Sequence, residues 1–257
     1  MKIKESFYVI LFYSSRKKWL VKVESGKEFH THLGIIRMDE VIDSEYGKSV
    51  KTNLDKTIYL IEPTIYDFVM KSERHTQIVY PKDLGFIVIR SGITNGSKVV
   101  EIGTGSAALT TYIASIVKPN GHVYTFDVNP KFMEVAKKNL VKANMLEYVT
   151  MNKYDVHLGL DLVDIDSVIV DLGDPWTVVG PLYKILKGSG SFLAICPTMN
   201  QLEKTSIALK ENHFIDIESV ELFIRNIEAR EGMSRPSMRM IGHTTYLIFA
   251  RKSITNQ

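Results

Sequence analysis

The sequence predicts an α/β protein in which a mostly parallel sheet is covered by helices and preceded by a small β domain. From about residue 91, short apolar runs alternate with amphipathic runs, which is typical of parallel strands joined by helices. A glycine-rich turn follows the first of these apolar runs, whereas the residues before about 60 contain only short β-like runs. The 257 residues are enough for one sizeable domain with a smaller companion.

The first 60 residues are predicted to form a small β-barrel or sheet, because no long helical period occurs there. The β-like runs, separated by turn and charge signals, are 6–13, 19–23, 31–36 and 57–60. Apolar residues then recur at helical spacing at Ile65, Phe68 and Val69, which predicts a linking helix over 63–73. The expected division is a β domain over 1–62, a linking segment over 63–90 and the α/β domain over 91–257.

The α/β domain is predicted to alternate strands and helices and to end in a β pair. The expected strands are 98–102, 122–127, 148–152, 167–172 and 191–197, and the expected helices are 107–117, 130–143, 178–186 and 198–211. Asn129 and Pro130 favour a helix start, because asparagine caps helices and proline suits the first turn. Two last runs, 214–225 and 244–252, have no helix between them, so we expect a hairpin that adds at least one antiparallel strand.

The composition is that of an ordinary globular protein, with 45% hydrophobic and 24% charged residues, so we expect a soluble chain. The single cysteine, Cys196, excludes an internal disulfide framework and fits a reducing cytoplasm. The apolar run 7–13 is too short to span a membrane. The histidines form no metal-binding pattern, and neither HExxH nor CxxC occurs, so we expect no metal. A net charge of +3 permits nucleic-acid binding but is weak evidence for it.

The loop Gly103-Thr104-Gly105 predicts a nucleotide-binding turn. Glycine allows a tight turn and leaves room for a ligand at the start of the following helix. Asp127 ends the next strand, about 20 residues after the glycines, where an acid accepts hydrogen bonds from ribose hydroxyls. Because Gly103, Gly105 and Ala108 also satisfy the dinucleotide pattern, the loop predicts an adenosine-bearing cofactor without identifying it.

Two further acids favour S-adenosylmethionine. Glu101 lies just before the loop, where a dehydrogenase strand normally stays apolar, and Asp155 follows the third strand, placed to accept a hydrogen bond from an adenine amino group. Acids at three successive strand ends resemble class I methyltransferases, which have a Rossmann-like sheet with an antiparallel terminal strand. In that class an acid at the Glu101 position helps to recognise the amino-acid end of the cofactor. Backbone groups expected to line the cofactor are those of Thr104, Gly105, Ser106 and Ala107.

Three other segments carry a more specific resemblance. They are RHTQIVYPKD at 74–83, DLGDPW at 171–176 and RPSMRMIGHTTY at 235–246. Together they resemble the tRNA (adenine-N1)-methyltransferases that modify the T-loop adenine at tRNA position 58, and the resemblance extends over nearly the whole chain. It implies S-adenosylmethionine as donor, S-adenosylhomocysteine as product, tRNA as partner and a homotetramer, with neither DNA nor a membrane involved. Methylation at position 57 as well is left open.

The chain departs from the family pattern at three positions. Ala107 stands where the family commonly has glycine, which is expected to crowd the helix start without preventing cofactor binding. Gly173 replaces a usual proline, and Thr245 replaces a frequent glycine. None of these changes removes a functional group, so activity is expected to persist.

The resemblance makes Asp171 the catalytic acid and a cofactor-binding residue. Adenine N1 is a poor nucleophile, and its methylation places a positive charge on the ring. A carboxylate beside the exocyclic amino group would orient the base, stabilise this charge and accept a proton. By the same resemblance Gln77 hydrogen-bonds the methionine portion of the cofactor, and Tyr80, the second expected catalytic residue, lines the pocket of the base or the methyl donor.

The target adenine must leave the stacked T-loop, because N1 lies on the Watson–Crick edge. Stacking on an aromatic ring offsets part of this cost, and of the candidates Tyr80 and Trp176 we favour Tyr80. The N-terminal domain and the basic region 225–239 are candidates for phosphate contacts. Residues expected to contact RNA in the last motif are Arg235, Arg239 and His243.

Other functions are left open at this point. A small-molecule methyltransferase would share the glycine loop and the three acids but would not need the segments 74–83 and 235–246. A non-catalytic tRNA-binding subunit would be expected to lose the loop or the catalytic aspartate, both of which this chain keeps. A dehydrogenase is disfavoured, since the chain has no hydride-transfer acid/base signature.

Overall fold

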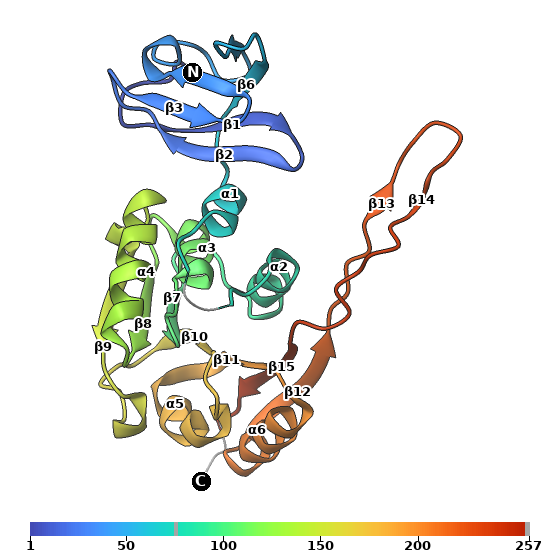
Figure 1. Ribbon diagram of the computed structural model, residues 1–257. Coiled ribbons are helices and arrows are strands. Elements are labelled where there is room, and N and C mark those ends of the chain that lie inside the picture. The colour runs from blue at the N-terminus through green and yellow to red at the C-terminus, as the bar shows by residue number, and fades with distance from the viewer. Residues whose placement is uncertain (75–76, 255–257) are drawn as a thin grey trace. The chain divides into compact units, whose positions relative to one another are not determined.

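The computed structural model describes residues 1–74 and 77–254, which form two compact units, Met1–Lys71 and Ser72–Gln257 (Figure 1). Unit 1 contains a four-stranded antiparallel sheet in the order β2-β1-β6-β5 and a separate β3-β4 hairpin. Its strands are β1 (Tyr8–Ser14), β2 (Lys17–Lys22), β3 (Glu28–Thr31), β4 (Gly34–Arg37), β5 (Ser49–Lys51) and β6 (Thr57–Ile61). Apolar side chains such as Val9, Leu11, Ile36 and Ile58 form its core.

The predicted single strand over 31–36 is wrong, because the chain turns between Thr31 and Gly34 and pairs with itself. The Thr31 hydroxyl donates to the Gly34 carbonyl and accepts from the Leu33 amide, both at 3.0 Å. Gly34 has a φ of +109°, and a Cβ there would lie 2.5 Å from the Asn53 side chain. A hydroxyl that bonds its own backbone is a turn signal that an apolar alternation hides.

The predicted linking helix is present as α1 (Ile65–Met70), and it groups with unit 1. Thr64 and Asp67 form a capping box at its start. Asp67 also pairs with Lys18 at 3.4 Å, and Phe68 meets the Tyr8 ring edge-on at 5.7 Å. These contacts attach α1 to the β sheet of unit 1.

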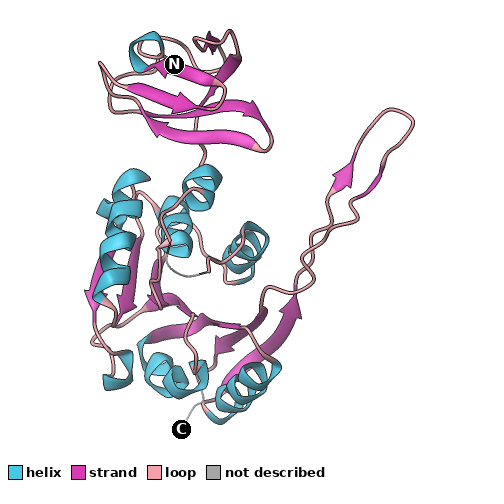
Figure 2. Cartoon of the chain, viewed as in Figure 1, coloured by secondary structure: helices cyan, strands magenta, loops and turns pink. Residues whose placement is uncertain are grey.

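Unit 2 has a seven-stranded sheet in the order β12-β15-β11-β10-β7-β8-β9 (Figure 2). Its strands are β7 (Lys98–Ile102), β8 (His122–Asp127), β9 (Val149–Lys153), β10 (Ile165–Val170), β11 (Leu186–Cys196), β12 (Phe214–Glu221) and β15 (Tyr246–Lys252). The strands from β11 to β9 run parallel, whereas β15 is antiparallel to both β11 and β12. The expected class I fold with an antiparallel terminal strand is thus confirmed.

Helices pack on this sheet in two groups. The helices are α2 (Pro81–Arg90), α3 (Ala108–Val117), α4 (Pro130–Lys142), α5 (Val179–Ile185) and α6 (Met199–Glu211). Short 3₁₀ turns occur elsewhere in the chain: η1 (Met38–Glu40), η2 (Leu146–Tyr148), η3 (Val156–Leu158) and η4 (Pro175–Val178). Alternate strand residues face opposite groups: Phe192 packs with Leu182 of α5, whereas Phe249 meets Phe86 of α2 at 5.6 Å. Helix α2 was not predicted, because its proline and glycine obscure the helical period.

Between β12 and β15 the chain forms an extension, residues 222–245, which we call the arm (Figure 1). Two short strands, β13 (Ile227–Glu228) and β14 (Arg235–Pro236), pair within it. The predicted hairpin of 214–225 with 244–252 is therefore present as the β12-β15 pair, but β12 ends at Glu221 and the arm replaces a tight turn. No helix in the described part of the chain is long and apolar enough to cross a membrane.

Candidate active site

The glycine loop passes directly over the end of β10, and only glycine fits at its first position. Gly103 has a φ of +93°, and a Cβ there would lie 2.2 Å from the backbone oxygen of Asp171. Backbone bonds fix the same junction, since the Gly103 amide donates to Phe126 and the Asp171 amide to Ile102, both at 2.8 Å. The loop and the strand end that carries Asp171 are thus held in contact.

Ala107 ends the loop in the left-handed conformation, with φ 59° and ψ 29°, and is fully buried. This backbone conformation favours glycine and costs another residue about 1 kcal/mol. Helix α3 nevertheless begins at Ala108, and the Ala107 carbonyl accepts a 2.6 Å bond from the Thr111 hydroxyl. The alanine is therefore accommodated at a modest cost in stability.

The largest of three described cavities, with a volume of about 560 Å³, lies over this loop, and we call it the loop cavity. Its lining includes Gln77, Gly103, Gly105, Phe126, Asp127, Phe132, Tyr154, Asp155, His157 and Asp171. The carboxyl ends of β7, β8, β9 and β10 meet here, as expected for a ligand crevice in an open α/β sheet. The aromatic residues Phe132, in α4, and Tyr154, just after β9, were not singled out in the sequence, because a lone aromatic residue is no signal by itself.

Asp127 is fixed by the backbone at the edge of the loop cavity. One carboxylate oxygen accepts from the Gly105 amide at 3.0 Å and the other from the Asn129 amide at 2.8 Å. Each oxygen keeps a second lone pair, so the carboxylate can still accept hydrogen bonds from a diol.

Asp155 caps η3 and also lines the loop cavity. Its Oδ1 accepts from the His157 amide at 3.0 Å and contacts the His157 ring at 2.7 Å. These bonds, led by the one with the imidazole, lower the pKa of Asp155, so the group is a carboxylate at neutral pH. Both bonds end on Oδ1, which leaves Oδ2 for a ligand.

Glu101 is buried beneath the loop, with 1% of its surface exposed. Its Oε2 accepts from Thr110 at 2.5 Å and from Thr125 at 2.9 Å, and Thr125 also contacts Thr104 at 2.7 Å. Burial raises the pKa of Glu101 to about 8. A small cavity of about 30 Å³, the Glu101 cavity, opens beside it and is shared with Gln77 and Asp171.

This burial predicts that the ligand-free protein loses stability as the pH rises. The folded-state pKa of about 8 lies above the ordinary 4.5, so between these values the folded chain holds a proton that the unfolded chain releases. The free energy of unfolding therefore falls across this window, and thermal unfolding at pH 5 to 8 measures it. Glu101→Gln should flatten the slope, whereas an unchanged slope in that variant would contradict the assignment.

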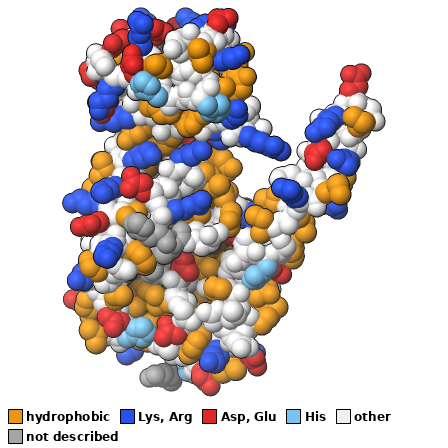
Figure 3. All heavy atoms as spheres, in the orientation of Figure 1, with side chains coloured by type: hydrophobic (Ala, Val, Ile, Leu, Met, Phe, Trp, Pro, Cys, Tyr) orange, Lys and Arg blue, Asp and Glu red, His pale blue; other side chains and the backbone are white. Residues whose placement is uncertain are grey.

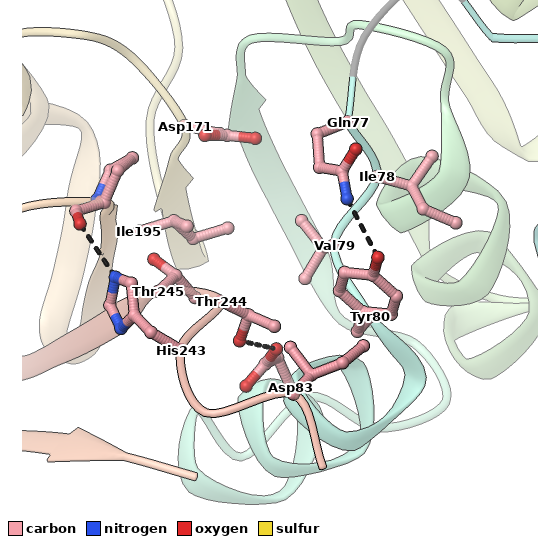
Figure 4. Close-up of a pocket in the computed structure, with 12 residues that line it drawn as sticks. Gln77, Ile78, Val79, Tyr80, Asp83, Asp171, Ile195, His243, Thr244 and Thr245 are labelled. Atoms are coloured by element: carbon pink, nitrogen blue, oxygen red, sulfur yellow. Dashed lines mark hydrogen bonds between the residues drawn. The ribbon is translucent and has the colours of Figure 1, made fainter. Parts of the chain in front are cut away.

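A second cavity of about 250 Å³, the arm cavity, lies between the start of α2 and the end of the arm (Figure 4). Its lining includes Gln77, Val79, Tyr80, Asp83, Asp171, Ile195, His243, Thr244 and Thr245. These residues come from four segments far apart in the sequence: 77–83, the end of β10, the end of β11, and 241–245. The cavity is smaller than the roughly 300–1,000 Å³ typical of pockets for drug-sized ligands, so it suits a single flat group.

Asp171 lines all three cavities, as does Gln77. Its side chain is exposed to the cavities, and the protein atoms packed around the carboxyl partly desolvate it. This desolvation raises the pKa of Asp171 to about 6, so the group is mostly a carboxylate at neutral pH. A carboxylate shared by a nucleotide-sized cavity and a smaller adjoining one is placed to act on a group that spans both.

Tyr80 and Gln77 form one wall of the arm cavity. The Gln77 side-chain amide donates to the Tyr80 hydroxyl at 2.9 Å (Figure 4). Tyr80 also precedes Pro81 as the N-cap of α2, so the helix start fixes its backbone. The two residues that the sequence placed at the donor and the base are therefore in direct contact.

Trp176 is placed elsewhere. It lies in η4, outside the linings of the three cavities among the described residues. The ammonium nitrogen of Lys204 lies over its ring, 4.6 Å from the ring centroid. Its assigned contact with RNA stays a prediction.

His243 lines the arm cavity, but protein groups engage both of its ring nitrogens. Nδ1 lies 2.6 Å from Glu221, and Nε2 lies 2.9 Å from the Pro197 carbonyl. These bonds, led by the one with Glu221, raise the pKa of His243. The ring therefore ties the end of the arm to β12 and to the end of β11.

Arg235 and Arg239 lie on the arm and outside the three cavities in the described structure. Arg235 contacts Glu228 at 3.5 Å across the β13-β14 pair. Both side chains are exposed, so their predicted contact with RNA is sterically open. Within residues 1–74 and 77–254, no three His, Cys, Asp or Glu side chains gather as a metal-binding group, and His75 lies outside these ranges.

Comparison with known proteins agrees with this geometry. A family model described as tRNA methyltransferase complex GCD14 subunit matches residues 56–233. The chain is 37% identical to the tRNA (adenine(57)-N(1)/adenine(58)-N(1))-methyltransferase TrmI of Methanocaldococcus jannaschii, over 95% of this chain and 94% of that protein. It is 27% identical to the tRNA (adenine(58)-N(1))-methyltransferase TrmI of Thermus thermophilus, over 92% and 93%.

Two solved structures resemble the whole chain. The tRNA (m1A58) methyltransferase TrmI of Aquifex aeolicus superposes with a TM-score of 0.86 at 29% identity, covering 99% of this chain and 100% of that one. A structure from Thermotoga maritima described as an S-adenosylmethionine-dependent O-methyltransferase gives a TM-score of 0.95 at 35% identity, covering 100% and 96%. Their descriptions differ in the atom that is methylated.

Proposed function

This chain belongs to the tRNA methyltransferase complex GCD14 subunit family, and from this premise we propose that it methylates N1 of adenine 58 in tRNA with S-adenosylmethionine. The single observation that carries the proposal is Asp171, which lines both the loop cavity and the arm cavity. A donor in the first and a base in the second would meet at this carboxylate. Because the M. jannaschii relative is described as acting at positions 57 and 58, adenine 57 is a second candidate target.

The loop cavity fits S-adenosylmethionine. Its volume of about 560 Å³ lies within the range typical of small-molecule pockets, and acidic and aromatic side chains line it. Asp127 would hold the ribose, Asp155 the adenine amino group and the Glu101 cavity the amino-acid end, with Gln77 and the loop residues beside them. When bound, this cofactor supplies an electrophilic methyl group on a sulfonium.

Asp171 supplies the acid–base and electrostatic chemistry of the transfer. Its carboxylate accepts a hydrogen bond from the adenine N6 amino group and so turns N1 toward the loop cavity. As N1 becomes positively charged, the negative charge of Asp171 stabilises the ring, and the protein atoms that desolvate the carboxyl strengthen this effect. The carboxylate can then accept a proton from the cationic amino group.

The acceptor and its position can be tested directly. Methyl transfer from labelled S-adenosylmethionine should label a tRNA transcript that carries adenine at position 58. Replacement of that adenine by another base should remove the label, apart from any label at position 57. Equal labelling of both transcripts would contradict the proposal, and label in small molecules alone would favour a small-molecule methyltransferase.

Tyr80 is proposed to stack on the flipped adenine. Stacking on an aromatic ring contributes about 1–3 kcal/mol per base, so Tyr80→Ala should lower kcat/KM for tRNA by about 10- to 100-fold. Tyr80→Phe keeps the ring and loses only the bond from Gln77, so it serves as the matched control with a smaller loss. Steady-state kinetics with tRNA as the varied substrate measure both effects, and equal losses in the two variants would argue against stacking.

Basic and aromatic side chains on unit 1 are proposed to contact tRNA. At the β1-β2 turn, Lys17 lies over Tyr13 and contacts His32 at 2.7 Å, with Arg16 beside it. Interleaved cations and rings suit phosphates and unstacked bases. The variant Arg16→Glu/Lys17→Glu should weaken tRNA binding by about tenfold and reduce its salt dependence. Lys56→Glu, on the β5-β6 turn, is the control, and equal affinities for the two variants would oppose this surface.

A homotetramer is proposed from the family resemblance and is supported by the arm. Figure 3 shows apolar side chains exposed along it, and these include Phe223, Ile224, Ile227 and Met238 at 57%, 56%, 62% and 83% exposure. Exposed apolar groups in such number mark an interaction surface. Sedimentation analysis of the purified protein determines its oligomeric state.

A cytoplasmic location is also proposed, since the free, buried Cys196 fits a reducing compartment.

A further inference from the structure

A cluster of Lys82, Asp83 and Thr244, of which Asp83 is buried and the other two are partly buried, lies at the arm cavity and has no part in the chemistry above. Asp83 is 1% exposed and the Lys82 side chain 10% exposed, although both are charged. Lys82 and Asp83 open helix α2, whereas Thr244 lies at the end of the arm, 161 residues beyond Asp83. Burying a charged side chain costs free energy unless the charge is paired and its hydrogen bonds are satisfied, so these two side chains need bonding partners within the protein.

Every ammonium proton of Lys82 has a hydrogen-bond acceptor. Its ammonium has three protons, two of which go to the Asp83 carboxylate at 2.7 and 2.9 Å and one to the Thr244 hydroxyl at 2.7 Å. The Thr244 hydroxyl donates its single proton to Asp83 at 3.2 Å. The cluster is electrically neutral, and all of its protons are used within the described residues.

The cluster can therefore only accept hydrogen bonds from a group in the arm cavity. Thr244 keeps one lone pair, and Asp83 keeps one on Oδ1. Both residues line the cavity, whereas Lys82 does not. A ligand group that meets this surface must be a hydrogen-bond donor.

The position of the cluster in the arm cavity indicates which group of the substrate donates this hydrogen bond. Figure 4 shows Asp171 on one side of the cavity and Asp83 and Thr244 on another, with Ile195 between them in the view. In the proposed function, on which this inference rests, Asp171 takes the N1 and N6 edge of adenine. The opposite part of the base offers N7, an acceptor, and leads to the ribose, whose 2′-hydroxyl is a donor.

We infer that Thr244, held by Lys82 and Asp83, accepts a hydrogen bond from the 2′-hydroxyl of the target nucleotide. Thr244 is thus a specificity-determining residue that favours a ribonucleotide over a deoxyribonucleotide at the methylated position. Lys82 and Asp83 are positioning residues that act through it, because they leave its hydroxyl only as an acceptor. The cluster also fixes the end of the arm to the start of α2, and so joins two walls of the cavity.

The test combines a substitution in the protein with a change of one atom in the substrate. A tRNA with a single 2′-deoxyadenosine at position 58 should lower kcat/KM of the wild-type enzyme by about tenfold, within the range of one hydrogen bond that involves a charged network. Thr244→Val should cause a similar loss with the all-ribose tRNA. In that variant the deoxy substitution should cost less than about twofold, since the partner atom is already absent.

Three controls separate this contact from general damage. Thr245→Val changes a neighbouring hydroxyl of the cavity that bonds the Tyr246 carbonyl, and it should keep the full tenfold deoxy effect. Thr244→Ser restores the hydroxyl and should restore the deoxy effect. The dissociation constant for S-adenosylmethionine should not change in Thr244→Val, because neither the loop cavity nor the Glu101 cavity includes Thr244.

An equal deoxy effect in the wild type and in Thr244→Val would overturn the inference, and so would a wild-type enzyme that is insensitive to the change. Either result would leave the proposed function intact if the all-ribose tRNA is still methylated. Failure of the wild-type enzyme to methylate any tRNA would instead refute the proposed function itself.

Discussion

Asp171→Ala is expected to lower the rate of methyl transfer by about 10²- to 10³-fold while leaving S-adenosylmethionine bound, because loss of one preorganised electrostatic partner has an effect of this size. The cofactor should stay because most of the loop cavity, including Asp127, Asp155 and the glycine loop, does not depend on this side chain. Single-turnover kinetics with saturating tRNA measure the chemical step, and calorimetry measures the cofactor affinity.

Asp171→Asn is the matched variant, since it keeps the shape and removes the charge. If charge stabilisation dominates, this variant should be nearly as slow as Asp171→Ala. If orientation of the amino group dominates, the asparagine carbonyl should recover part of the rate. Near-normal turnover in both variants would remove Asp171 from its assigned role.

Gly103→Ala is expected to weaken cofactor binding by about 100-fold and to lower activity with it. The new Cβ would lie 2.2 Å from the Asp171 backbone oxygen, and backbone cannot move aside as a flexible side chain can. Overpacking of this kind costs about 1–3 kcal/mol, and a clash with backbone belongs at the upper end. The loop and the end of β10 would therefore separate, which should affect both the proposed cofactor site and Asp171.

Gly92→Ala separates this clash from simple backbone strain. Gly92 also has a positive φ, +65°, but a Cβ there meets nothing within 4 Å. It should therefore cost about 1 kcal/mol of stability without a change in cofactor affinity. Calorimetric titration of both variants with S-adenosylmethionine measures their cofactor affinities. Equal affinities in Gly92→Ala and Gly103→Ala would contradict a steric clash at Gly103.

The donor side of the site could be predicted from sequence because its signals are local. The glycines at 103 and 105 and the acids at 101, 127 and 155 each stand at a strand end, and parallel topology brings strand ends together. Apolar runs marked the strands well enough to place these ends within a few residues. The family motifs then pointed to Asp171, Gln77 and Tyr80, which line one cavity in the structure.

The acceptor side was only partly predictable, because its contacts are long-range. Nothing near Asp83 in the sequence indicates a bond to Thr244, and a lysine next to an aspartate reads as a solvated pair. The arm was hidden for a similar reason: residues 222–245 carry no strong period, so a plain hairpin was expected. The contact of His243 with RNA stays a prediction, and its bonds to Glu221 and Pro197 could not be predicted, because only the folded chain brings these partners near.

The identity of the methylated atom distinguishes methylation of adenine N1 from methylation of N6 or of a ribose hydroxyl. The enzyme and S-adenosylmethionine should be incubated with an unmodified tRNA, which is then digested to nucleosides and examined by mass spectrometry against standards. We expect 1-methyladenosine, located to position 58 by sequencing of the product, and its loss with Asp171→Ala. Methyl groups found only as N6-methyladenosine or as a 2′-O-methyl nucleoside would contradict it.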